Sequence, residues 1–364
     1  MSAKTPIFFT GATGYIGGTV LLRLLEHHTF TSSEITALLR PTKADQIPVF
    51  ESIGVKTVLG TNDDLELLEK QASQSEVVFT CSDADDVPAC EAILRGLKKR
   101  HEKSGKVPIL IHTSGTGVLA DNAQGNYTYD TIWDDMNPDQ LDTLPDTQPH
   151  RNVDLRIVAA DGEGYVKTFI VLPSTIYSIA RGKLVDLGIQ NSRSIQIPSL
   201  IRAGLARGQG GIIGKGENKW PNIHIDDLAE LYMILYDGIL SGRAGHGREG
   251  LYFAAGDEHL MRDLYKTVAQ ALYELGKGKS PEPTPFLQEE CDPNVFTLGT
   301  NSRCKANRAR TLGWKPKYTT EDMLESVTRL GVLNEVARGS PLDAVLLVEG
   351  DCYLSCSPSS DNCK

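Results

Sequence analysis

The sequence lacks several features that would each indicate a particular class of protein. No apolar run approaches the ~20 residues that a membrane-spanning helix needs. The residues from Met1 to Thr5 show no basic segment followed by an apolar one, which is the pattern of a secretory signal. We therefore expect a cytoplasmic protein with no membrane partner.

Basic residues are also in the minority. The 364-residue chain has 37 Lys and Arg against 47 Asp and Glu, which gives a formal net charge of -10. A protein that binds nucleic acid uses Lys and Arg to neutralise backbone phosphates. The charge balance therefore argues against a nucleic-acid partner.

Metal-binding patterns are missing as well. None of the seven cysteines forms the two paired short spacings of a zinc site, so we expect free thiols. His27 and His28 are adjacent, but they come at the end of a predicted helix, where the negative end of the helix dipole favours histidine. We therefore predict no metal site.

The feature that is present, and that organises the chain, is a glycine-rich turn near the N-terminus. An apolar run ends at Thr10, the turn carries Gly11, Gly14 and Gly17, and an amphipathic helical pattern follows. This strand, turn and helix together predict a dinucleotide site. Gly11 permits a sharp turn, Gly14 lets the backbone approach a pyrophosphate, and Gly17 lets the helix pack closely on the strand. The phosphates are then expected at the helix N-terminus.

Further cofactor contacts are expected at the ends of later strands. Arg40 ends the second predicted strand, where an acidic residue would favour NAD and an arginine accommodates the 2′-phosphate of NADP. We therefore favour NADP(H). The remaining predicted cofactor residues are Thr10, Thr13, Tyr15 and Ile16 in the glycine-rich motif, and Asn62, Cys81, Thr113 and Pro173 further along the chain.

Strands and helices alternate along the first half of the chain. Apolar strands are predicted at 34–41, 55–60, 77–81, 109–113 and 166–172, with helices at 65–72, 88–103 and 150–162. This alternation predicts an α/β fold with a doubly wound parallel sheet covered on both faces. The polar stretch 114–147 is long for a loop in a compact domain, so we expect it to be functional or mobile.

The domain boundaries follow from the same pattern. We assign 1–180 and 211–242 to a dinucleotide-binding Rossmann domain, and 181–210 and 243–338 to a small substrate-binding lobe. Residues 339–364 are interpreted as a partly disordered tail.

Several segments together resemble the short-chain dehydrogenase/reductase superfamily. They are Thr10–Gly17, Thr113–Val118, Val171–Tyr177, Asn222–Ala229 and Ala309–Pro316. The similar branch is the extended or atypical one, with NAD(P)-dependent epimerases and dehydratases, dihydroflavonol-reductase-like enzymes and NmrA-like proteins. The resemblance runs from about residue 5 to about residue 330. It implies a Rossmann sheet with a C-terminal substrate lobe and hydride transfer between a nicotinamide and the carbonyl of a small molecule. It is also compatible with a homodimer.

The chain departs from this family at the catalytic pair. The resemblance implies a tyrosine and a lysine one turn apart on the helix before the sixth strand, and a serine after the fifth. His150 and Asp154 occupy the tyrosine and lysine positions. The serine position aligns with Gly115, flanked by Ser114 and Thr116.

Four interpretations of this departure stay open. His150 could donate the proton, oriented by Asp154, because a carboxylate raises the pKa of an imidazole. Alternatively, Tyr127 or Tyr129 could donate from the long loop. A third interpretation is a non-catalytic NADP(H)-binding regulator or sensor, for which the NmrA-like proteins are the family precedent. A fourth is a redox-neutral isomerase that uses the same pocket.

Overall fold

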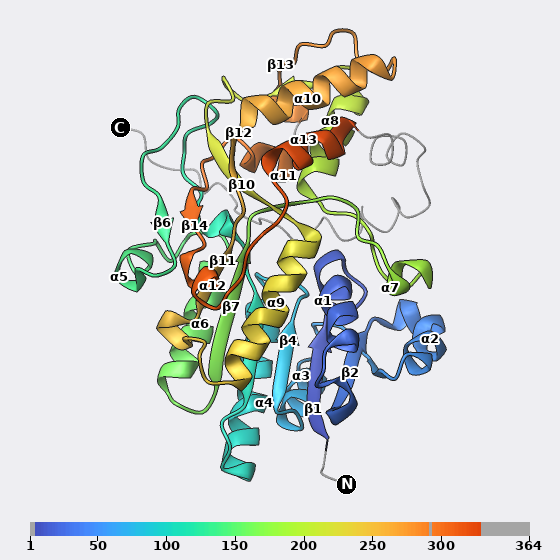
Figure 1. Cartoon of the computed structure of the whole chain (residues 1–364), viewed down its shortest axis with the longest axis vertical. Coiled ribbons are helices and arrows are strands. Elements are labelled where there is room, and N and C mark those ends of the chain that lie inside the picture. The colour runs from blue at the N-terminus through green and yellow to red at the C-terminus, as the bar shows by residue number, and fades with distance from the viewer. Residues whose placement is uncertain (1–3, 291–292, 329–364) are drawn as a thin grey trace.

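The computed structural model describes residues 4–290 and 293–328. The predicted tail at 339–364 lies outside these residues. The described chain forms a large parallel sheet with helices on both faces and a smaller lobe above the carboxyl ends of the strands (Figure 1). The predicted Rossmann architecture is confirmed.

The main sheet has seven strands in the order β11-β7-β5-β4-β1-β2-β3, and every neighbouring pair is parallel. The strands are β1 Thr5–Thr10, β2 Ser33–Leu39, β3 Lys56–Leu59, β4 Val77–Thr80, β5 Ile109–Thr113, β7 Lys167–Pro173 and β11 Leu251–Ala254. The strand order changes direction between β1 and β4. In open α/β sheets ligands bind outside the carboxyl ends of the strands at such a point.

Helices cover both faces of this sheet. Phe79 of β4 packs against Tyr236 of α9 (Ile225–Leu240), and α9 lies beside α1 (Tyr15–Glu26) (Figure 1). The next residue, Thr80, lines a cavity on the other face together with residues of α4 (Val87–Ser104) and α6 (Arg151–Gly162). Alternate residues of a strand point to opposite faces, so the two helix layers enclose the sheet. The helices α2 (Ile47–Ser52) and α3 (Leu65–Ser73) complete this part.

The strands are apolar runs because both of their faces are buried. The adjacent residues Phe8 and Phe9 of β1 are each 0% exposed, and Phe9 stacks on Phe79 with ring centroids 5.5 Å apart. An antiparallel sheet with one wet face would alternate apolar and polar residues. Burial of both faces of the sheet by helices therefore explains the uninterrupted apolar runs in the sequence.

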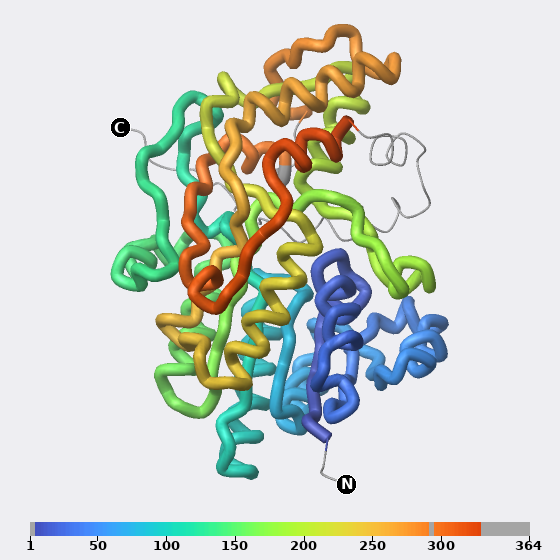
Figure 2. Tube along the Cα trace, viewed as in Figure 1, coloured from blue at the N-terminus to red at the C-terminus, as the bar shows by residue number. Residues whose placement is uncertain are grey.

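The lobe has a core of its own. It contains Leu200, Trp220, Tyr265 and Met323, none of which belongs to the core around the main sheet. The lobe joins segments that lie far apart in sequence, as the green, orange and red parts of the tube show (Figure 2). Its elements are β8 Thr175–Tyr177, α8 Gln196–Arg207, β9 Gly211–Ile212, β10 Lys219–His224, β12 Glu258–Leu260, α10 Met261–Glu274, β13 Thr284–Pro285, α11 Pro293–Thr297 and α13 Thr320–Thr328. The short helix α7 (Lys183–Asp186) instead packs beside α1, and its Leu184 belongs to the core around the main sheet.

The predicted long loop contains short elements and is held to the C-terminal part of the chain. It carries a 3-10 turn at Thr116–Leu119, β6 at Trp133–Asp134 and α5 at Pro138–Leu141. β6 pairs with β14 (Cys304–Lys305), which precedes α12 (Asn307–Thr311). The buried Asp135 accepts backbone N–H bonds from Arg308 and Phe253. The loop is therefore tied to the segment that carries β14 and α12 and to the edge strand β11 of the main sheet.

The start of α9 is capped by His224, whose Nδ1 accepts a hydrogen bond from Asp226 N. Asp227 instead accepts backbone bonds from Lys317 and Tyr318. This connection between the helix and a distant segment is not visible in the local sequence.

Candidate active site

The glycine-rich turn has the geometry of a phosphate cradle. Gly11 has φ +76°, and a Cβ placed on it would lie 2.3 Å from Cys81 O. A Cβ on Gly17 would lie 2.1 Å from Gly11 O. Gly14 precedes the first turn of α1, and no side chain caps that turn. No side-chain cap satisfies the backbone N–H groups of this turn, which is the arrangement that anion-binding helix starts use.

The predicted cofactor residues at the strand ends gather around this turn. Thr10 Oγ1 is 3.0 Å from Ser82 Oγ, which in turn is 3.5 Å from Asn62 Oδ1. Thr113 Oγ1 donates to Cys81 Sγ at 3.3 Å. These contacts link the carboxyl ends of β1, β4 and β5 with the residues that follow β3.

Cys81 is not a reactive thiol in this position. Burial raises the pKa of its thiol to about 12, although the hydrogen bond from Thr113 opposes this. A thiol of that pKa stays protonated at neutral pH and is a poor nucleophile. Cys81 therefore acts as a small packing residue beside Gly17.

A basic pair follows β2. Arg40 precedes a 3-10 helix at Pro41–Gln46, and Lys43 N donates to Arg40 O at 2.8 Å. The Lys43 ammonium donates to Thr13 Oγ1 in the glycine-rich turn at 3.0 Å. Sequence reasoning singled out Arg40 and missed Lys43. The sequence signal for it was a second cation three residues after Arg40.

Tyr15 connects the glycine-rich turn to the chain that follows β8. Its hydroxyl donates to Tyr177 O at 3.0 Å and to Ser178 O at 2.7 Å. Burial, with a contribution from the charge of Asp226, raises the pKa of Tyr15 well above its usual value. Asn191 N also donates to Thr13 O at 2.9 Å. The segment from 178 to 191 therefore touches the start of α1 at two places.

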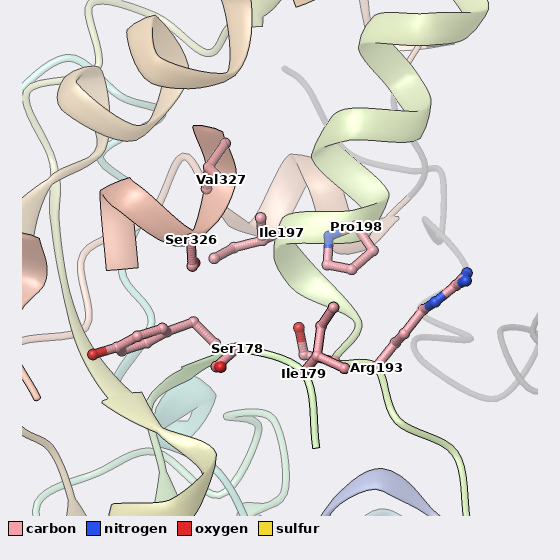
Figure 3. Close-up of a pocket in the computed structure, with 9 residues that line it drawn as sticks. Ser178, Ile179, Arg193, Ile197, Pro198, Ser326 and Val327 are labelled. Atoms are coloured by element: carbon pink, nitrogen blue, oxygen red, sulfur yellow. The ribbon is translucent and has the colours of Figure 1, made fainter. Parts of the chain in front are cut away.

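A pocket opens where this segment meets the lobe. Figure 3 shows Ser178 and Ile179 below it, Ile197 and Pro198 of α8 beside it, and Ser326 and Val327 of α13 above it. Its lining mixes apolar side chains with serine hydroxyls. This pocket could not be predicted from any local sequence pattern, because its lining comes from three separate segments.

His150 is the residue before α6 and has an unusual backbone, with φ +65°. Its backbone N–H and its Nδ1 lie 3.0 Å and 2.9 Å from the same carboxylate oxygen, Asp85 Oδ1. Nε2 faces the turn after β5, because Cβ atoms built on Gly115 and Gly117 would lie 3.1 Å and 3.3 Å from it. The absence of side chains at these two glycines leaves room for the ring.

The imidazole and its carboxylate support each other electrostatically. Burial lowers the pKa of His150, but the hydrogen bond and charge of Asp85, followed by the charge of Asp154, outweigh burial and raise it overall. Burial raises the pKa of Asp85, and the hydrogen bond and charge of His150 outweigh that effect and lower it. The pair therefore favours an imidazolium beside a carboxylate.

Asp154 has a different partner from the one predicted. It is fully buried, and Ser114 Oγ donates to its Oδ2 at 3.0 Å. Burial raises the pKa of Asp154 to about 6, although the charge of His150 opposes this. The carboxylate hydrogen-bonded to His150 belongs to Asp85, so the expected orientation of His150 by Asp154 is wrong in this structure.

Among the other predicted catalytic residues, the two tyrosines are half exposed and the threonine is buried. Tyr127 and Tyr129 are each 48% exposed, and their carbonyls accept bonds from Asn301 and Arg303. Thr116 is fully buried, and Ser302 Oγ donates to its carbonyl.

The Tyr-x-x-x-Lys spacing itself occurs once in the chain, at Tyr273 and Lys277. Tyr273 lies near the end of α10 in the lobe and is 48% exposed. That pair is on the surface of the lobe and not on α6, where the family resemblance would place it.

No protein-family model matches the chain. An oxidase named ucsJ from Acremonium sp is 31% identical over 85% of this chain and 92% of its own length. An isoflavone reductase homolog from Solanum tuberosum is 38% identical over 82 residues, which are 22% of this chain and 27% of that protein.

Solved structures share the fold at low identity. UDP-glucose 4-epimerase from Thermotoga maritima, with UDP-glucose, has a TM-score of 0.59 at 16% identity, covering 89% of this chain and 97% of that one. A dTDP-glucose 4,6-dehydratase from Streptomyces venezuelae, with NAD bound, has a TM-score of 0.59 at 19% identity, covering 91% and 99%.

The described helices include none that is both long and apolar enough to cross a membrane. The parallel sheet, the glycine-rich turn and these similarities lead to one assignment. The chain belongs to the short-chain dehydrogenase/reductase superfamily, as an atypical member with the fold of the epimerase and dehydratase branch.

Proposed function

We propose that this protein is an NADP(H)-dependent oxidoreductase that reduces a carbonyl or imine of a small metabolite, with His150 as its proton donor. The observation that carries the proposal is the His150–Asp85 pair at the carboxyl edge of the sheet, with Nε2 directed at Gly115 and Gly117. A regulator that only bound a cofactor would not need a charged imidazole held in this way.

The glycine-rich turn supports the binding of a nicotinamide dinucleotide. Cβ atoms on Gly11 and Gly17 would collide with neighbouring backbone. Without these atoms, the backbone of the turn packs closely at the start of α1. A pyrophosphate fits this surface through the N–H groups of the first helical turn. The similar dehydratase structure carries NAD, which agrees with this use of the fold.

The residues after β2 support a preference for NADP(H). Arg40 and Lys43 stand at the start of the 3-10 helix after β2, and the Lys43 ammonium contacts Thr13 of the glycine-rich turn directly. Two positive charges next to the expected adenosine ribose favour a 2′-phosphate over a 2′-hydroxyl.

The chain's own groups supply the proton. When bound, the reduced cofactor supplies a hydride to the carbonyl carbon of the substrate. The Asp85 carboxylate accepts the Nδ1–H of His150, which places the transferable proton on Nε2. Nε2 would donate that proton to the substrate oxygen, or to the nitrogen of an imine, as the adjacent carbon takes up the hydride. The products would be an alcohol or an amine, the oxidised cofactor, and a neutral imidazole that regains its proton from solvent.

The proposal is tested by separating binding from turnover. NADPH binding is followed by its fluorescence, and NADPH consumption is measured across a library of small aldehydes, ketones and imines. We expect His150→Ala to bind NADPH normally and to lose about 10²–10⁴-fold in kcat/KM, the usual contribution of a general acid. His246→Ala is the matched control, because His246 also pairs with a carboxylate, Asp161, at 2.9 Å, but on the surface.

Three results would contradict the proposal in different ways. Binding of NADPH without consumption of any library member would favour the regulator. Equal turnover in His150→Ala and the wild type would remove His150 from the chemistry. Equal affinity for NADH and NADPH would remove the cofactor preference.

A further inference from the structure

A second group of chemically active side chains lies at the opposite end of α1 from the glycine-rich turn. His27 caps the C-terminal end of α1, His28 follows it, and Asp237 projects from α9. The His27 Nε2 to Asp237 Oδ1 distance is 3.2 Å, and the His28 Nδ1 to Asp237 Oδ1 distance is 4.0 Å. One ligand atom from each residue can be chosen so that all three lie within 4.8 Å of one another.

An ion pair alone does not explain this arrangement. One imidazole is enough to pair with Asp237, yet two rings lie with their centroids 4.2 Å apart and both approach the same carboxylate oxygen. Two imidazoles this close repel each other when both are protonated. The 4.0 Å separation of His28 from Asp237 is also too long for a hydrogen bond. A cation placed among the three groups would use both rings and the carboxylate.

The surroundings favour such a cation. His27 Nδ1 lies 2.9 Å from Thr29 Oγ1 and 3.4 Å from Thr29 N, and these contacts hold the ring with Nε2 directed at Asp237. The C-terminal end of a helix also carries a partial negative charge.

We propose that His27, His28 and Asp237 form a zinc site that joins the end of α1 to α9, with water as the fourth ligand. Two imidazoles and one carboxylate are a recurrent ligand set for this ion. The side chain of His27 is only 7% exposed and holds its position, whereas those of His28 and Asp237 are 70% and 47% exposed and can move to bonding distance. The two histidines alone gave no reason to predict a metal, because Asp237 comes 210 positions after His27.

The site is independent of the proposed reaction, so its test does not use activity. The full-length protein is treated with EDTA and dialysed, and its Tm is measured with increasing Zn²⁺. At a zinc concentration about a hundredfold above the Kd, we expect Tm to rise by a few degrees, because ligand binds only the folded state. Co²⁺ added in place of zinc should give the visible absorption band of a tetrahedral site.

Two variants assign the effect to these residues. His28→Ala and Asp237→Asn change exposed side chains and should fold, and each should lose the Tm rise and the cobalt band. His246→Ala is the control and should keep both, because His246 pairs with one carboxylate on another surface. A wild type with no Tm rise, or variants that keep the full rise because the cysteines bind the zinc, would overturn the proposal.

Discussion

His150 and Asp85 are 65 positions apart in the sequence, yet Asp85 Oδ1 lies 2.9 Å from His150 Nδ1 and 3.0 Å from its backbone nitrogen. One carboxylate oxygen therefore fixes both the ring and the backbone at the start of α6. The left-handed backbone of His150, with φ +65°, makes this double contact possible. Asp85 therefore orients the imidazole, and its charge, followed by that of Asp154, favours the protonated ring.

Replacing Asp85 by Asn should shift the pH dependence of the reaction. Asp85 raises the pKa of His150, so the proton donor is charged below that raised pKa and the reduction rate falls as pH rises through it. In Asp85→Asn this support is lost, and the fall in kcat should move to lower pH. The measurement is kcat against pH with saturating NADPH and substrate. Asp161→Asn is the control, because it alters the pair with His246 and should leave the pH profile unchanged. An unchanged profile in Asp85→Asn would show that the His150–Asp85 pair does not take part in catalysis.

The features that the sequence predicted best are local ones. The turn with Gly11, Gly14 and Gly17 depends on backbone freedom within a few residues, and the structure gives Gly11 the positive φ that only such a residue adopts easily. The buried strands were equally evident, because a doubly covered sheet produces continuous apolar runs.

The partner of His150 could not be chosen from the sequence. The stretch of four positions from 83 to 86, which follows β4, contains Asp83, Asp85 and Asp86. No local pattern indicates which of the three carboxylates contacts His150. Asp85 reaches His150 only because the turn after β4 and the start of α6 meet at the same edge of the sheet. Asp154 looked like the partner because it lies one helical turn away, but the fold directs it to Ser114.

Removing the charge of Lys43 should discriminate between the two nicotinamide cofactors. Lys43→Met keeps an unbranched side chain and deletes the ammonium that contacts Thr13. A charge-assisted contact to a phosphate is worth about 1.5–3 kcal/mol, so NADPH affinity should fall by about 10- to 100-fold. NADH affinity should change little. Isothermal titration with both cofactors measures this, with Lys56→Met as a control, because Lys56 pairs with Glu34 on the surface. An equal loss for both cofactors would place Lys43 away from the 2′-phosphate.

A methyl group at Gly17 should damage both stability and cofactor binding. Its Cβ would lie 2.1 Å from Gly11 O, and backbone there cannot move without opening the turn. We expect Gly17→Ala to lose about 1–3 kcal/mol in the free energy of unfolding, the usual cost of overpacking. Gly162→Ala is the matched control, because a Cβ there meets nothing within 4 Å and helix propensity favours alanine by about 1 kcal/mol. Urea unfolding measures the loss of stability, and NADPH titration measures the loss of cofactor binding. A Gly17→Ala protein as stable as the wild type would contradict the close packing of Gly17 against Gly11.

Replacing Asp154 by Asn should change how stability depends on pH. Burial raises the pKa of this carboxyl from 3.8 to about 6, so the folded state binds the proton more tightly than the unfolded state. Stability from this group is therefore fully present below about pH 4 and decreases as pH rises through 6, by about 3 kcal/mol in total. Asn resembles the protonated carboxyl and can still accept the bond from Ser114. The variant should equal the wild type near pH 4 and exceed it by up to about 3 kcal/mol at pH 8. His112, whose pKa burial lowers to about 3, receives no contribution from Asp154, so its effect is common to both proteins and cancels in this difference. Urea unfolding of both proteins across this range measures it, and a difference that stays constant with pH would show that Asp154 does not carry the raised pKa.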